Sequence, residues 1–449
     1  MAGRSEFPAR ALLLLTAAAL AARVLLLVLE PSTSPVADER TWANWARTIA
    51  SPRVAFSPFR THMIFHPPLY PYFLAVPLAL TGSLEAAKWV QATLSVLLVP
   101  AVGRVGTWAF GARAGLGAAA LAAFYPELVW FAAHFWVENV FLVLLWWGFE
   151  RLLAADARGR TGPAVAAGVL WGLAVLARET VLYFVPVAAL WLVWRRRADG
   201  GARRAAALVL STVLVIVPWT WRNWVEFGAF IPVSTAGGLN LFQGNAPLSR
   251  QEVYDEYDAV RGRREQYRHA LRRGLESIRD RQPSWLFEKL AEQMPMFWEA
   301  ESMAAIHIKR GAYGPVPPGR AILFALILLL PYLALLLPFV AGLAGARYGR
   351  IQVLLAAFLV HYNLLHVVTH GFNRYRLPVM PVVFLFASWA LVAWREGSFP
   401  KLSPVRRAVA AALAITLLLS LVPSLRHVRH PAYGFAPAAA ETLDEAPRP

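Results

Sequence analysis

The chain has 449 residues, of which 58% are hydrophobic and 16% are charged, and its formal net charge is +17. Soluble domains carry roughly 25% charged residues, whereas the apolar residues here form long runs. The composition therefore excludes a soluble domain, a disordered chain, collagen and a coiled coil. The absence of cysteine excludes thiol nucleophiles, thiolate metal sites and disulfides.

Eleven apolar segments predict an all-α polytopic membrane protein whose amino end lies inside and whose carboxyl end lies outside. The first segment follows Arg10 and is longer than the apolar part of a signal peptide, so we expect a retained helix. The predicted helices lie near residues 11–29, 86–107, 114–133, 137–154, 163–178, 180–194, 205–221, 321–341, 351–370, 377–394 and 407–423.

The placement of arginine and lysine agrees with this topology. Short cytoplasmic loops hold an excess of these residues, and here they gather in the segments predicted inside, above all 195–204 and 395–407. The sequence therefore predicts a multi-pass protein of the cytoplasmic (inner) membrane, in contact with membrane lipids and with a cytoplasmic N-terminus. Topology accounts for the positive charge, so we do not expect nucleic-acid binding.

Two segments predicted outside are too long to be simple connectors, and functional residues are expected there. The first, residues 30–85, carries four prolines between 67 and 77, which favour an interfacial or re-entrant segment over a spanning helix. The second, residues 222–320, predicts two amphipathic helices over the mouth of the bundle. Its apolar residues recur at helical spacing at Tyr267, Leu271, Leu275 and Ile278, and again at Leu286, Leu290, Met294 and Phe297.

These boundaries divide the chain into four predicted parts. An N-terminal transmembrane catalytic module spans residues 1–221 and includes the outer loop 30–85. A helical extracytoplasmic loop domain follows at 222–320, then C-terminal transmembrane helices at 321–424 and a tail at 425–449. We find no internal repeat, which weakens the interpretation of the chain as an inverted-repeat transporter.

An acidic pair, Asp38 and Glu39, follows the first predicted helix on the outer side, before Trp42 and Trp45, which favour the membrane interface. A carboxylate there can take the proton of an acceptor hydroxyl as the hydroxyl attacks, which is general-base catalysis. The alternative is structural: Asp38 caps a helix that starts near Thr41, with Glu39 favourable in its first turn. The residues alone leave both alternatives open.

Two further charges are predicted at the outer face. Glu138 opens a helix there, either as a second carboxylate of the site or as a partner of the helix dipole. Arg178 occupies a short outer turn, against the topology preference, and suggests an anionic ligand such as phosphate, which guanidinium binds through two hydrogen bonds. The alternative is a pairing of Arg178 with Glu179 or with a lipid headgroup.

More basic residues are predicted at the outer surface. Together with Arg178 they are candidates to converge on one phosphate. Taken singly, the arginines have the alternative of interfacial snorkelling, and the histidine has that of a hydrogen bond in a proline-rich turn. These residues are His66, Arg222, Arg374 and Arg376.

No cofactor or metal is expected. His361, His366 and His370 lie on one predicted helix without an H-E-x-x-H motif, which favours hydrogen bonding within the bundle over a metal site. The Asp-x-Asp arrangement that holds divalent ions on sugar nucleotides is absent from the first outer loop. A divalent metal held by Asp38 and Glu138 is the alternative.

In order and spacing, these motifs resemble those of the GT-C glycosyltransferases, specifically bacterial family 39 members related to protein O-mannosyltransferases and to the aminoarabinose transferase ArnT. The resemblance runs nearly from end to end. It lies in Ala37-Asp38-Glu39, His66-Pro67-Pro68-Leu69-Tyr70-Pro71, Tyr125-Pro126 followed by Glu138, Leu176-Ala177-Arg178, Val217-Pro218-Trp219-Thr220-Trp221-Arg222-Asn223-Trp224, Pro232-Val233-Ser234-Thr235, Gly237-Gly238-Leu239-Asn240-Leu241, Gly244-Asn245 and Arg374-Tyr375-Arg376-Leu377-Pro378.

The resemblance implies a GT-C-type bundle and an inverting glycosyltransferase. Such an enzyme moves a sugar from a polyprenyl-phosphate donor to a lipid, glycan or protein acceptor on the extracytoplasmic face. Asp38 would be its general base, with Glu39 supporting it and Glu138 as a second acidic residue. His66 stands where the aminoarabinose branch has a lysine near the donor phosphate, and Arg178 matches a basic position. Tyr70, Arg222, Arg374 and Arg376 complete the predicted substrate-binding set.

Two other functions compete with this one. A ligase or polymerase of the O-antigen type would use a diphosphate-linked donor and would depend on arginine and histidine rather than on Asp38. A flippase or transporter of lipid-linked glycans would catalyse no transfer. The Asp38→Asn variant separates them, because only a general-base enzyme should lose its activity.

Overall fold

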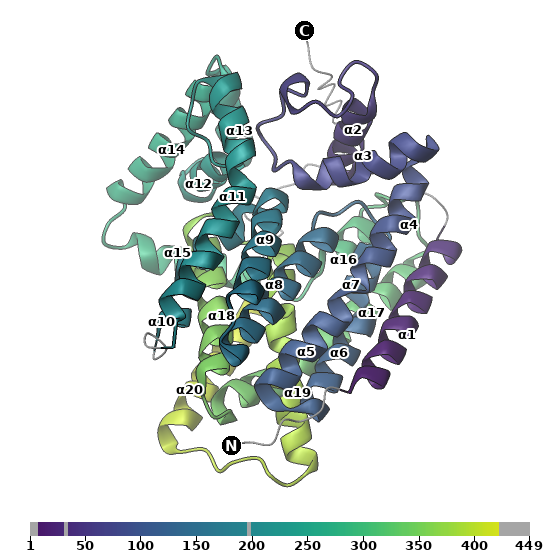
Figure 1. The fold of residues 1–449 in the computed structure, drawn as a ribbon, viewed down its shortest axis with the longest axis vertical. Helices are drawn as coiled ribbons and strands as arrows, with labels where there is room; N and C mark the ends of the chain where they lie inside the picture. The colour runs from purple at the N-terminus through teal and green to yellow at the C-terminus, as the bar shows by residue number, and fades with distance from the viewer. Residues whose placement is uncertain (1–7, 31–34, 195–198, 422–449) are drawn as a thin grey trace.

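The computed structural model describes residues 8–30, 35–194 and 199–421. Within these ranges all regular structure is helical, as the composition predicts, and Figure 1 shows a bundle with further helices gathered at one end. The predicted tail 425–449 and the end of the predicted helix 407–423 lie outside the described residues.

The bundle is built from apolar helices that run back and forth between its two ends. Basic residues gather at the end where α5 meets α6 and α8 meets α9. The helices are α1 (Ala9–Leu29), α4 (Leu84–Ser95), α5 (Leu98–Phe110), α6 (Ala112–Phe124), α7 (Pro126–Ala132), α8 (Glu138–Arg158), α9 (Thr161–Ala177), η2 (Glu179–Phe184), α10 (Val185–Val193), α11 (Gly201–Phe227), α17 (Pro318–Gly345), α18 (Arg350–Val368), η3 (Asn373–Val379), α19 (Met380–Arg395) and α20 (Pro404–Leu421).

Each of the eleven predicted segments is a helix or a helix pair. Among the described residues, seven are long and apolar enough to cross a membrane, and the pair α6–α7, bent by 50°, gives an eighth. The helices α9 and η2–α10 are shorter than the ~20 residues of a usual span, and α8 carries several charges along its length. The fold class is confirmed, but the count of eleven spans is not.

Aromatic side chains fill the centre of the bundle. The ring of Phe149 on α8 lies 5.2 Å from that of Trp171 on α9 and 5.0 Å from that of Phe358 on α18. Phe184, at the end of η2, lies 5.1 Å from Phe358. Gly148 permits this packing, because a Cβ atom there would lie 2.2 Å from Trp171.

The first outer loop forms two helices that pack on each other, α2 (Asp38–Ala50) and α3 (Leu69–Thr81), with a short turn η1 (Pro58–Arg60) between them. Figure 1 shows both at the end of the bundle opposite the α8–α9 turn. With 13 residues and an internal Pro77, α3 is too short to span a membrane. This agrees with the interfacial or re-entrant segment that the prolines predict.

The second outer segment holds five helices: α12 (Ala236–Asn245), α13 (Arg250–Ala259), α14 (Arg263–Asp280), α15 (Trp285–Phe297) and α16 (Met303–Lys309). Figure 1 shows α12, α13 and α14 at the same end as α2 and α3, whereas α15 and α16 lie beside helices of the bundle. The two predicted amphipathic helices are α14 and α15, whereas α12, α13 and α16 were not predicted. The boundary predicted after residue 221 falls inside α11.

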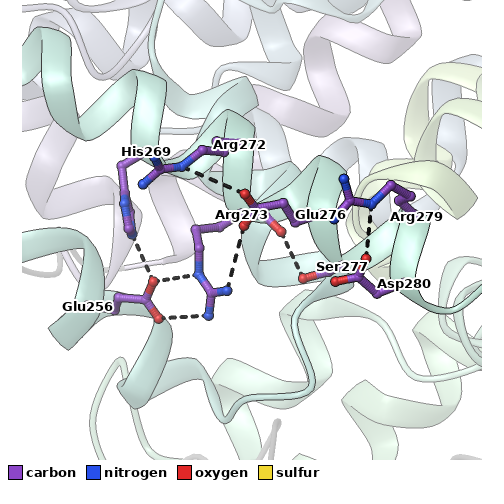
Figure 2. A network of polar contacts seen from close by, with 8 residues as sticks. All are labelled: Glu256, His269, Arg272, Arg273, Glu276, Ser277, Arg279 and Asp280. Atoms are coloured by element: carbon purple, nitrogen blue, oxygen red, sulfur yellow. Dashed lines mark hydrogen bonds and ion pairs between the residues drawn. The ribbon is translucent and has the colours of Figure 1, made fainter.

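A polar network joins α13 to α14, as Figure 2 shows. Arg273 Nε donates to Glu256 Oε1 at 2.7 Å, and His269 Nε2 lies 2.8 Å from the same oxygen. Glu256 therefore serves as a shared acceptor between the two helices. Asp255 and Asp258 lie on the exposed side of α13.

Candidate active site

Asp38 is the first residue of α2 and forms an ion pair with Arg374, whose Nη1 lies 2.6 Å from Asp38 Oδ2. The interpretation of Asp38 as the cap of a helix starting near Thr41 is wrong, because the helix starts at Asp38 itself and Ala37 occupies the cap position; Glu39 does lie in the first turn, as that alternative predicts. Ala37 has φ 45°, a left-handed conformation that costs energy for a residue with a Cβ. The chain thus makes a sharp turn that presents Asp38.

The carboxylate of Asp38 is ionised in this position. Burial alone would raise its pKa, but the charge and hydrogen bond of Arg374 more than offset that effect, and the pKa lies below its ordinary value. The side chain nevertheless keeps 49% of its surface exposed. Asp38 is therefore a charged acceptor that a substrate can reach, although protein surrounds it.

Arg374 and Arg178 both contact the aromatic ring of Tyr375. The guanidinium carbon of Arg178 lies 4.6 Å from the ring centre of Tyr375, and that of Arg374 lies 5.4 Å from it. Arg178 forms an ion pair with Glu138, the first residue of α8. The structure thus brings Asp38, Arg374, Arg178 and Glu138 into one cluster, and the alternative pairing of Arg178 with Glu179 is not the one formed.

His66 lies beside this cluster, with its ring 4.8 Å from that of Trp42 on α2. Burial lowers the pKa of His66 to about 4. The negative charge of Asp38 raises this pKa, and the positive charge of Arg374 lowers it further. The imidazole is therefore neutral at pH 7. It can donate one hydrogen bond to a phosphate but adds no positive charge.

Glu39 faces away from Asp38 and is almost completely buried, with 2% of its surface exposed. The hydroxyl of Tyr313 donates to Glu39 Oε1 at 2.5 Å, and the backbone N–H of Phe135 donates to Oε2 at 3.3 Å. Both oxygens of Glu39 are therefore engaged inside the protein.

Tyr70, Arg222 and Arg376 hold other parts of the protein together. The hydroxyl of Tyr70 donates to Gln91 Oε1 at 2.6 Å, although its ring lies 5.5 Å from Trp42. Arg222 donates to the backbone oxygens of residues 58 and 63, at 2.9 and 2.7 Å. Arg376 pairs with Glu127 at 3.4 Å inside the bundle. The structure does not bring the two arginines into the Asp38 cluster, and their role in substrate binding stays a prediction.

Several residues of the site were not singled out from the sequence. Tyr313 lies in the irregular segment Gly311 to Pro317, where no periodicity marks it. Arg250, the first residue of α13, acts electrostatically on both Asp38 and His370. The only signal for its position is the capping box at Ser249, which predicts a helix start.

Histidines of α18 are used for internal contacts, as the sequence favours. His366 Nδ1 donates to the backbone oxygen of Tyr362 at 2.8 Å, and its ring lies 5.0 Å from that of Tyr375. In the part of the chain that the structure describes, no three His, Asp or Glu side chains are grouped so that they could hold a metal ion. The expectation that no metal is required stays a prediction.

Comparison with known proteins supports the resemblance. Residues 65–221 match the family of dolichyl-phosphate-mannose-protein mannosyltransferases. The oligosaccharyltransferase AglB of Archaeoglobus fulgidus, in complex with an inhibitory peptide and a dolichol-phosphate, superposes with a TM-score of 0.53 at 17% identity and over 91% of this chain. ArnT of Cupriavidus metallidurans, bound to undecaprenyl phosphate, does so with a TM-score of 0.52 at 15% identity and over 93% of this chain. This chain has the GT-C fold.

The extent of these matches differs. The chain covers 55% of AglB and 71% of ArnT. No curated protein matches its sequence significantly. The region that matches the mannosyltransferase family contains His66, Tyr70, Glu138 and Arg178, but not Asp38 or Arg374.

Proposed function

We propose that this protein is an inverting glycosyltransferase that moves a sugar from a polyprenyl-phosphate donor to an acceptor on the extracytoplasmic face of the membrane. The observation that carries the proposal is the ion pair between Asp38 and Arg374. It places an ionised, accessible carboxylate next to a cation at one end of a GT-C bundle. A general base and a phosphate ligand are the two groups that such a transfer needs.

Asp38 acts as the general base in this proposal. Its carboxylate accepts the proton of an acceptor hydroxyl while that oxygen forms a bond to the anomeric carbon of the sugar. The bond between that carbon and the phosphate oxygen breaks on the opposite side, and the phosphate leaves with the bonding electrons, which inverts the configuration. Binding of the phosphate to Arg374 would compete with Asp38 for the guanidinium and so raise the basicity of Asp38.

The phosphate is recognised by Arg374 and Arg178, with a hydrogen bond from His66. Guanidinium groups give bidentate contacts to phosphate oxygens and stabilise the negative charge that grows on a leaving phosphate. Glu138, paired with Arg178, fixes the direction of that side chain. Support for a lipid-linked donor comes from the two structural neighbours, which were solved with dolichol-phosphate and with undecaprenyl phosphate.

The distribution of charge supports the extracytoplasmic face. The end of the bundle opposite Asp38 carries Arg113, which pairs with Glu396, and Arg350, which pairs with Asp156 at 2.9 Å. Short basic connections mark the cytoplasmic side of membrane proteins. Nucleotide sugars are cytoplasmic, so an outward-facing site needs a donor delivered on a lipid.

Glycosyl transfer in proteoliposomes tests the proposal. A panel of radiolabelled polyprenyl-phosphate sugars is offered together with a membrane extract as the source of acceptors. We expect transfer from one donor, and a kcat at least about 100-fold lower for Asp38→Asn. Asp258→Asn, an exposed aspartate on α13, is the matched control and should behave as wild type.

Two results would count against the proposal. Equal transfer by wild type and by a folded Asp38→Asn variant would remove Asp38 as the base and favour a ligase with a diphosphate-linked donor. Absence of transfer from every donor, together with movement of a lipid-linked glycan across the vesicle membrane, would favour a flippase.

A further inference from the structure

The contacts of Glu39 connect the candidate site to a distant segment of the chain. Glu39 follows Asp38 directly and is held by Tyr313, which lies 274 residues further along the sequence. The ring of Tyr313 packs 4.7 Å from His134 and 5.9 Å from Trp130. These contacts fix the ring, so its hydroxyl has a defined direction toward Glu39.

The segment that carries Tyr313 also accepts hydrogen bonds from residues on either side of Arg374. Asn373 Nδ2 donates to the backbone oxygen of Glu301 at 2.7 Å, and Arg376 donates to that of Glu299. Residues 299–313 therefore contact the neighbours of Arg374 at one end and the neighbour of Asp38 at the other. This segment bridges the two partners of the ion pair.

The second donor to Glu39, the backbone N–H of Phe135, is also fixed by hydrogen bonds. Phe135 lies in the loop between α7 and α8, where Gln91 Nε2 donates to the backbone oxygen of Ala132 at 3.1 Å and Asn139 Nδ2 donates to that of Trp136 at 3.1 Å. Both side chains are buried. Each oxygen of Glu39 thus receives a hydrogen bond from a fixed donor.

We propose that Tyr313 is a positioning residue, whose hydroxyl holds Glu39 and thereby sets the first turn of α2 and the direction of Asp38. The inference rests on the proposed function, because it assigns Tyr313 a part in the base catalysis proposed for Asp38. Ala37, which precedes Asp38, has a positive φ, and such strain persists only where surrounding contacts hold the backbone.

The anchor depends on the charge of Glu39. An ionised carboxylate accepts both hydrogen bonds with the strength of a charged acceptor, whereas a protonated one accepts them more weakly and carries an O–H that needs an acceptor of its own. Burial raises the pKa of Glu39 to about 7, against the hydrogen bonds of Tyr313 and Phe135 and the charge of Lys88 on α4. Glu30, at the end of α1, raises it further, and Tyr70 on α3 also faces this group.

The pH dependence follows from the sign of this shift. Glu39 is protonated below about pH 7, so transfer should rise with pH through a midpoint near 7. Loss of the Tyr313 hydroxyl removes a hydrogen bond to the ionised form, and the pKa of Glu39 then lies still higher. The acid limb of the activity of Tyr313→Phe should therefore move to higher pH.

The experiment compares full-length wild type with Tyr313→Phe in the transfer assay. We expect a kcat lower by about 10- to 100-fold, because a base displaced by a fraction of an ångström transfers protons poorly, and an unchanged donor KM, because Arg178 and His66 are untouched. Glu39→Gln should lose the limb near pH 7. The double variant should be no slower than the slower single variant, because both act through one contact.

Hydrogen–deuterium exchange gives a readout that needs no substrate. The amides of residues 36–42 should exchange faster in Tyr313→Phe than in wild type, while those of α14 stay unchanged. Tyr348→Phe is the matched control, because it likewise removes one hydrogen bond donated by a tyrosine hydroxyl, here to the backbone oxygen of Leu343 at 2.8 Å and at the opposite end of the bundle. It should change neither the exchange nor the pH profile.

The outcomes separate the two proposals. If wild type transfers no sugar from any donor, the proposed function fails, and unchanged exchange at residues 36–42 would still overturn the anchoring role of Tyr313. If wild type is active and Tyr313→Phe keeps its kcat and pH profile, the positioning proposal is overturned, even if the exchange is faster.

Discussion

At the scale of single residues, Arg374 connects the two parts of the candidate site that carry carboxylates. It pairs with Asp38, and its guanidinium carbon lies 4.9 Å from the ring centre of Trp136, two residues before Glu138. It also contacts the ring of Tyr375, which Arg178 contacts as well. A planar guanidinium suits this place, because it can stack on rings while it donates hydrogen bonds in its plane.

This geometry predicts that lysine cannot replace Arg374. Lysine keeps the charge but loses both the fork of donors and the stacking on aromatic rings, so the donor KM of Arg374→Lys should rise about tenfold or more. Steady-state transfer kinetics with the labelled donor measure this. Arg268→Lys, an exposed arginine on α14, is the control. An unchanged donor KM in Arg374→Lys would mean that charge alone is recognised.

At the scale of elements, the position of the site depends on close packing between α8 and its neighbours. Glu138 starts α8 at the outer end, and ten residues later Gly148 receives the ring of Trp171 from α9. The same helix α9 ends beside Arg178. The contact between α8 and α9 therefore sets the distance between Glu138 and Arg178.

Gly148→Ala tests this packing. The added Cβ atom would lie 2.2 Å from Trp171, so the ring or the helix must shift, and overpacking of this kind costs about 1–3 kcal/mol. We expect a lower Tm in detergent and a reduced kcat for transfer. The control is Gly162→Ala at the start of α9, where an added Cβ meets nothing within 4 Å. Equal Tm values for the two variants would contradict the packing argument.

At the scale of the whole molecule, the outer helices α2, α3 and α12–α14 gather at the end where Asp38 lies, and the basic short connections lie at the other end. The candidate site and the basic connections that orient the protein in the membrane therefore lie at opposite ends of the bundle. This separation gives the molecule a direction in the membrane that a single measurement can check.

Thiol labelling tests that direction, because the chain contains no cysteine and every introduced one is unique. We expect a membrane-impermeant maleimide to label Arg40→Cys on α2 in intact spheroplasts. Ala157→Cys, near the end of α8, should react only after the membrane is permeabilised. Both positions are exposed in the structure. The reverse labelling pattern would place the site in the cytoplasm and would exclude the proposed orientation.

The sequence alone predicts the helical class and the place of nearly every helix in the bundle, because hydropathy is a local property that each segment carries by itself. It also predicts that Asp38 follows the first helix and that Glu138 opens a helix, both on the outer face. It does not predict α12, α13 and α16, whose short stretches show no clear periodicity.

The assembly of the site depends on tertiary structure. Asp38 and Arg374 are 336 residues apart, and the sequence around each residue does not predict that the two side chains form an ion pair. The same holds for Glu39 and Tyr313. Hydropathy determines whether a segment crosses or borders the membrane. It does not determine which helices pack together, or which face of a helix contacts its neighbour. For this reason Arg374 and Arg222, alike in the sequence as outer arginines, end in different places. Arg374 contacts the exposed carboxylate of Asp38, whereas the guanidinium of Arg222 donates hydrogen bonds to backbone oxygens of a loop.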